Sequence, residues 1–162
     1  MKRKLIAAFG TILGILVVFT SCSAQNAAEK IIGNLTSGTV NLSSGGGQIT
    51  TSDGALQFGD NLKWPGDKMP GIPEMKGKIS GIINDNSTGG CSVTYSDVSA
   101  SDAQAYRDSL KAKGYGNGLE SADNDGLLFS GTNSSGEGVM FTYNTSSKDG
   151  MVMYTPAQKT AS

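Results

Sequence analysis

The sequence predicts an α+β domain, in which an antiparallel sheet of about five strands carries one helix on one face (ββαβββ), preceded by a small β-rich N-terminal segment. Two observations support this fold class. Short segments alternate apolar and polar residues, and turns rich in Asn, Asp, Gly and Ser separate them. A longer stretch between the second and third of these segments has the apolar spacing and end signals of a helix. One helix packed on an antiparallel sheet is a stable two-layer solution for this order.

The strands are predicted from their alternation and from the turns between them. Ser52-Asp53-Gly54 has the composition of a hairpin turn, within a thin alternation of apolar residues from 34 to 58. Later connectors, such as Asn124-Asp125-Gly126, are short enough for an antiparallel meander. The main domain should contain strands at 78–83, 91–97, 127–130, 138–144 and 151–155.

The helix is predicted to follow the second of these strands. Ser99 or Ser101 can serve as its N-cap, and Ser101 with Gln104 would form a capping box. Its apolar stripe consists of Ala103, Tyr106 and Leu110. Gly114 can take the left-handed conformation beyond the last turn, which would place Tyr115 against the end of the stripe in a Schellman motif.

One face of the sheet should pack on the helix. The residues expected on this face are Cys91, Val93, Tyr95, Val139, Phe141 and Tyr143. The opposite face then carries Thr94, Ser96, Met140 and Thr142, and it is only half polar. Such a face must be wet, pack on the N-terminal meander or bind something, so these four residues are candidate ligand-binding residues.

Trp64 is the only tryptophan and begins a stretch that holds three of the four prolines. Because proline fixes φ and removes a backbone donor, we expect extended irregular chain from Trp64 to Lys78. The indole ring is expected to pin this stretch to the domain. The functional alternative is an exposed ring that binds sugar or lipid, which makes Trp64 a fifth candidate ligand-binding residue.

The N-terminal residues predict export and lipid attachment. A basic start, Lys2-Arg3-Lys4, precedes an uncharged apolar run, which is typical of a secretory signal peptide. Phe19-Thr20-Ser21-Cys22 resembles the lipobox of bacterial lipoproteins, whose cysteine is linked to diacylglycerol and becomes the new N-terminus. Two alternatives stay open: ordinary cleavage after Ala24, which would free the protein, and an uncleaved anchor. Lipoprotein processing attaches at least two acyl chains, which is enough for stable membrane anchoring through Cys22.

The expected organisation follows from these segments. Residues 1–21 are the lipoprotein signal peptide and 22–33 a tether. Residues 34–63 form a small β-meander or a partly disordered segment. Residues 64–156 form the α+β domain, and 157–162 a disordered tail.

Composition excludes several kinds of chemistry. The chain has no histidine, which rules out Ser-His-Asp and Cys-His sites and His-ligated metals. Cys91 alternates with apolar neighbours, so we expect a buried side chain and not a reactive thiol. Asp123-Asn124-Asp125-Gly126 resembles part of a calcium loop, but Thr132 stands where the loop needs Glu, so a turn is the better interpretation. We expect no catalytic residue, metal or cofactor.

Several motifs resemble a family of small, uncharacterised lipoproteins of Gram-positive bacteria. They are the Trp-Pro and Pro-Glu opening at Trp64-Pro65 and Pro73-Glu74, two strands, the helix motif Tyr106-Arg107-Asp108-Ser109-Leu110-Lys111 followed by Gly114-Tyr115, and a β-meander. The resemblance covers about Lys63 to Thr155. It implies an extracytoplasmic location and the fold, and it implies no chemistry because the family's function is unknown.

These observations favour a lipid-anchored lipoprotein on the extracytoplasmic face of the cell membrane that acts as a non-catalytic binding module. Its expected partner, besides the membrane itself, is a protein or an envelope polymer. Nucleic acid is excluded because the net charge is already −1 before Lys2, Arg3 and Lys4 leave with the signal peptide. A structural or assembly role in the envelope is one alternative. The other is a hydrolase that uses two carboxylates from Asp97, Asp102, Glu120, Asp123 and Asp125.

Overall fold

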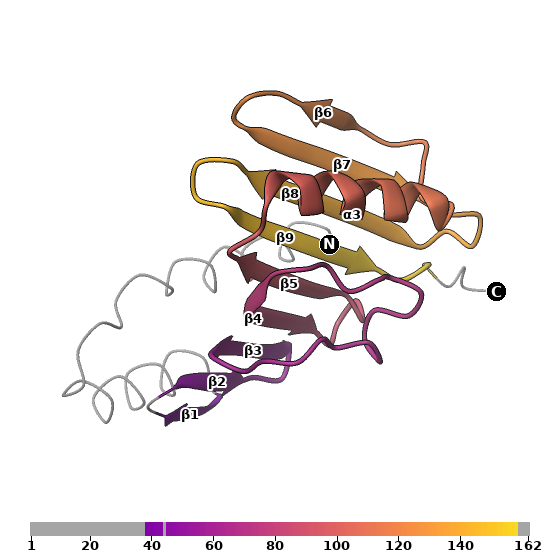
Figure 1. Cartoon of the computed structure of the whole chain (residues 1–162). Coiled ribbons are helices and arrows are strands. Elements are labelled where there is room, and N and C mark those ends of the chain that lie inside the picture. Colours follow the sequence, from indigo (N-terminus) through magenta and orange to yellow (C-terminus); the bar gives the residue numbers. More distant parts are fainter. Residues whose placement is uncertain (1–37, 44, 159–162) are drawn as a thin grey trace.

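The computed structural model describes residues 38–43 and 45–158, which form one antiparallel sheet of nine strands with a single helix (Figure 1). The strand order across the sheet is β1-β2-β3-β4-β5-β9-β8-β7-β6. The elements are β1 (Thr39–Ser43), β2 (Gly46–Thr50), β3 (Gly54–Gly59), β4 (Lys78–Asp85), β5 (Cys91–Ser96), α3 (Ala100–Ala112), β6 (Glu120–Ala122), β7 (Gly126–Thr132), β8 (Gly138–Asn144) and β9 (Asp149–Thr155).

The prediction of a five-stranded α+β domain was wrong. The five predicted strands are present as β4, β5, β7, β8 and β9, but the sheet continues beyond them at both edges. Leu56 of β3 pairs with Ile83 of β4, so the N-terminal meander extends the same sheet and does not pack on its face. At the other edge, β6 adds a three-residue strand along β7. The predicted hairpin turn joins β2 to β3, where the Thr51 N–H donates to the Gly54 carbonyl at 2.8 Å.

The core lies on one side of this sheet. In Figure 1, α3 and the segment 60–77 lie on the same side, with α3 over β7 and β8 and the segment over β4 and β5. Tyr106 of α3 joins the two covering layers: its ring packs edge-on to Phe141 at 5.0 Å, and its hydroxyl donates to the Pro73 carbonyl at 3.0 Å. The helix stripe Ala103, Tyr106 and Leu110 is buried, as its spacing predicts.

A β-bulge in β4 decides which residues reach this core. The pairing register with β5 shifts between Ile79 and Gly81, so Ser80 is an extra residue. Ile79 and Ile82 are both buried, although they are three positions apart and strict alternation would place them on opposite faces. The extra residue at the bulge returns Ile82 to the core face.

Both ends of α3 are capped by local hydrogen bonds. The Ser99 hydroxyl accepts the Asp102 N–H at 3.1 Å, so Ser99 is the N-cap and the capping box predicted at Ser101 is wrong. At the other end Gly114 has φ +87°, and its N–H donates to Lys111. The Tyr115 N–H donates to the Leu110 carbonyl at 3.2 Å, which confirms the Schellman motif.

Replacing Ser99 with alanine should lower the free energy of unfolding by about 1 kcal/mol, because the Asp102 N–H loses its partner. The matched variant Ser101→Ala should lower it by a few tenths at most, since its hydroxyl caps no backbone group. Urea unfolding followed by circular dichroism measures both values. Equal losses in the two variants would contradict Ser99 as the N-cap.

Candidate binding surface

The candidate site is the outer face, by which we mean the sheet surface on the side away from α3. The pairing register places two rows of side chains on it. The first row is Val40, Ile49, Leu56, Ile83, Ser92, Met153, Met140 and Ser130. The second row is Leu42, Gly47, Phe58, Gly81, Thr94, Met151, Thr142 and Leu128. Neither row contains a charged residue, and both mix apolar side chains with small hydroxyls.

Three methionines lie together on the outer face. Met140 of β8 pairs directly with Met153 of β9, and Met151 pairs with Thr142 on one side and Thr94 on the other. All three are half-buried. A hollow of about 210 Å³ opens beside Met140 and Met153. Its other lining residues are Gly118, Ser130, Gly131, Thr132, Gly138, Val139 and Thr155.

The structure brings four of the five predicted ligand-binding residues onto one surface. Thr94, Ser96, Met140 and Thr142 alternate with buried neighbours and point away from α3. Trp64 lies on the opposite side of the sheet: it packs against the core, and its ring centroid is 6.5 Å from that of Tyr95. This position confirms Trp64 as a pin for the segment 60–77 and separates it from the other four.

Sequence reasoning missed Met151, Met153 and Leu128 as members of the surface. In β9 the buried residues are Val152 and Tyr154, so the alternation Met-Val-Met-Tyr already indicated that both methionines point the other way. What the sequence lacked was the strand order. Only the pairing of β9 between β5 and β8 shows that these methionines join Met140 and Thr94.

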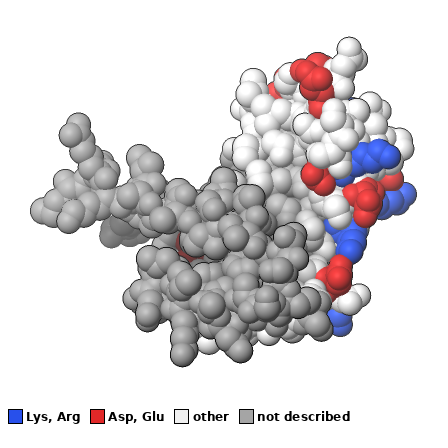
Figure 2. All heavy atoms as spheres, turned by 90° about the vertical axis from the view of Figure 1, so that its left-hand side faces the viewer, with Lys and Arg blue, Asp and Glu red and all other residues white. Residues whose placement is uncertain are grey.

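Charged side chains gather elsewhere. Figure 2 shows most of the blue and red side chains on the right of the view, which is the α3 side. Several of them form ion pairs on or beside α3, such as Lys111 with Glu120 at 2.6 Å and Lys76 with Asp102 at 3.4 Å. At the rim of the outer face the register places Lys78 beside Ser96 and Asp149 beside Asn144, so the uncharged character belongs to the two rows named above.

The carboxylates proposed for a hydrolase are dispersed. Asp102 begins α3, where the Ser99 hydroxyl and Lys76 hold the pKa of its carboxyl below the usual value. Glu120 lies in β6 and pairs with Lys111 and Arg107. Asp97 directly follows β5, and Asp123 and Asp125 share the turn before β7, where the Asp123 carboxylate accepts backbone N–H groups. This dispersal argues against a two-carboxylate site.

The segment 123–126 is a turn. The Asp123 carboxylate accepts hydrogen bonds from the N–H groups of Asp125 and Gly126 at 2.9 and 3.0 Å, so this oxygen stabilises the turn. Among residues 38–43 and 45–158, no three His, Cys, Asp or Glu side chains are grouped to hold a metal ion.

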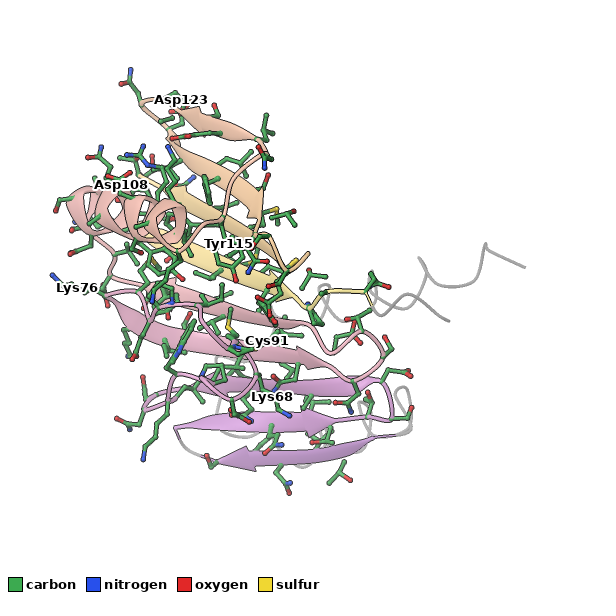
Figure 3. The ribbon with its side chains drawn as sticks, turned by 90° about the vertical axis from the view of Figure 1, so that its right-hand side faces the viewer. Lys68, Lys76, Cys91, Asp108, Tyr115 and Asp123 are labelled. Atoms are coloured by element: carbon green, nitrogen blue, oxygen red, sulfur yellow. The ribbon has the colours of Figure 1, made fainter. Side chains whose placement is uncertain are left out.

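Cys91 is buried, as its alternation predicts. Only 2% of the residue is exposed, and it faces the core with Val93 and Tyr95 (Figure 3). Burial raises the pKa of its thiol to about 11, so almost no thiolate forms near neutral pH.

Scans against protein-family models, curated proteins and solved structures found no match to this chain. The resemblance to Gram-positive lipoproteins therefore stays a prediction. Cys22, the signal peptide and the tether lie outside the described residues, as does the end of the predicted tail. Within the part of the chain that the structure describes, no helix is long and apolar enough to span a membrane.

In a chain carrying Cys22→Ala, Cys91 should react with a maleimide only after unfolding. The matched variant adds Cys91→Ala and Ser92→Cys, which moves the thiol to the next residue and to the outer face. It should react at least ten times faster in the folded state. Mass spectrometry of timed samples measures both rates. Equal rates would contradict the assignment of residue 91 to the buried face of β5 and residue 92 to the outer face.

Proposed function

We propose that the protein is a lipid-anchored, extracytoplasmic binding module that holds a protein partner on its outer face and performs no catalysis. The observation that carries this proposal is the outer face itself, two uncharged rows across eight strands with three half-buried methionines at one end. The cores of protein interfaces are depleted of charge and enriched in methionine. Methionine is also common on surfaces that adapt to different partners, because its unbranched side chain repacks easily.

A protein fits this surface better than an envelope polymer does. Polymers of sugars are held by hydrogen-bonding side chains and aromatic platforms, whereas the apolar groups here are mainly aliphatic and thioether, with Phe58 the one aromatic ring in the two rows. The hydroxyls of Thr142 and Ser92 can supply a few hydrogen bonds between the apolar patches, whereas the Thr94 hydroxyl already donates to the Gly81 carbonyl. This mixture is typical of an interface that forms and separates.

Two further lines support the remaining parts of the proposal. The lipobox-like sequence that ends at Cys22 supports export and attachment to the membrane. The absence of histidine and the dispersal of the five candidate carboxylates support a role without catalysis.

The variant Cys22→Ala should lose its acyl mass and appear in the soluble fraction, whereas wild type should stay with the membrane. Intact-mass spectrometry and fractionation of the same cells measure the two properties. The control is Ser23→Ala, which leaves the cysteine in place. A mature wild-type chain that begins at Gln25 without lipid would contradict the anchor.

A photo-crosslinking side chain placed at residue 140 should give a discrete protein adduct in intact cells, because this position lies on the outer face. The same group at Gln104, on the exposed side of α3, should give none. Adding Met153→Lys should reduce the adduct at residue 140 at least tenfold, since the partner would have to bury a charge. Circular dichroism checks the fold of each variant. Identical adducts from residues 140 and 104, or no adduct from 140, would contradict the proposal.

A further inference from the structure

The edge strand β1 lacks the charge, proline and bulge that usually prevent strand pairing. Its sequence Thr39-Val40-Asn41-Leu42-Ser43 contains no charge and no proline, and its register with β2 is continuous. The opposite edge of the sheet is different: β6 is three residues long and carries Glu120, which pairs with Lys111. Of the two edges formed by the described strands, β1 is therefore the one suited to pair with another strand.

The turn between β1 and β2 identifies which backbone N–H and C=O groups of β1 point away from β2. Ser43 pairs with Gly46, and two residues connect them. In a hairpin with a two-residue loop, the two residues that flank the loop form a hydrogen-bonded pair. Hydrogen bonding alternates along an antiparallel pair, so Thr39, Asn41 and Ser43 direct their backbone groups to β2. Val40 and Leu42 then direct theirs outward, along the edge.

We propose that β1 pairs antiparallel with β1 of a second copy of this chain, about a two-fold axis that passes beside Asn41. In this register Asn41 faces the partner's Asn41, and Val40 faces the partner's Leu42. The outward groups of Val40 and Leu42 then bond to those of the partner's Leu42 and Val40. The pairing is isologous, so it closes at two copies and leaves no further edge of this kind.

Both faces of β1 are self-complementary in this register. On the outer face the aliphatic row of Val40 and Ile49 continues into the row of the second copy. On the other face Asn41, Gln48 and Gln57 form a ladder of amides across β1, β2 and β3, and a second ladder would meet it at Asn41. Stacked amides favour such pairing. Like charges do not oppose it, because neither β1 nor β2 contains a charged residue.

The two-fold axis would run perpendicular to the sheet, which places the outer faces of both copies on the same side. The pair would thus present one continuous surface of twice the area. This assembly goes beyond the proposed function, and it can be tested without knowing the partner protein.

The test uses the full chain in isolated membranes, with Asn41→Cys and treatment with copper phenanthroline under air. Residues that face each other without mutual hydrogen bonds have Cα atoms about 4.5 Å apart, within the range of a disulfide. We expect a reducible band at twice the monomer mass for Asn41→Cys. Gln48→Cys, one strand further in, and Ser121→Cys, at the β6 edge, should give no such band. Untreated and treated wild type control for the two natural cysteines.

A second measurement keeps the test independent of oxidation. The detergent-solubilised wild-type chain should sediment as a dimer, and Val40→Lys should shift it to a monomer while Thr50→Lys does not. Circular dichroism verifies that both variants fold. A monomeric wild type, a band from Ser121→Cys equal to that from Asn41→Cys, or an Asn41→Cys adduct with a different protein in place of a second copy would each overturn the proposal. Loss of the photo-adduct at residue 140 with retention of this dimer would contradict only the proposed function.

Discussion

The structure depends on the burial of one sheet face beneath two covering segments that meet at Tyr106. The tyrosine ring packs on Phe141 of β8, and its hydroxyl bonds to the carbonyl of Pro73. Through this side chain, α3 is held to the segment 60–77 as well as to the sheet. Loss of a buried aromatic ring of this kind costs about 3–5 kcal/mol. Because only this face is covered by described segments, the alternate residues of each strand are left for the outer face, and the candidate surface is a direct consequence.

Much of the central sheet could be predicted from the sequence, because its strands alternate cleanly. In β5 and β8 every second residue is apolar and buried, and the two ends of α3 carry standard capping residues. The continuation of the sheet into β1–β3 could not be predicted. There the apolar residues Leu56 and Ile49 lie on the outer face, opposite to the core, and the bulge at Ser80 shifts the alternation of the strand beside them. The outer-face position of these residues and the bulge can be recognised only from the strand-pairing register.

The candidate surface was predicted in part for the same reason. Alternation alone places Thr94 and Met140 on the uncovered face, and the structure agrees. The contribution of Met151 and Met153 required the strand order, which no local pattern encodes. Trp64 is the opposite case. As the only tryptophan it was a candidate ligand-binding residue, but in the structure it packs against the core beside Tyr95. A single unusual residue is therefore weaker evidence for a site than a row of ordinary ones.

The position of β9 has a consequence for how the chain folds. β9 is the last of the described strands along the chain but central in the sheet, where Val152 lies between Val93 of β5 and Phe141 of β8. Strands β1–β5 and strands β6–β8 therefore remain two separate halves, each with an open edge, until the final segment is inserted between them. Pairing between residues as distant as Cys91 and Tyr154 is slow, because a long loop must close first. The sheet can therefore be completed only after β9 has been synthesised, and loss of β9 would leave the two halves of the sheet without a pairing strand between them.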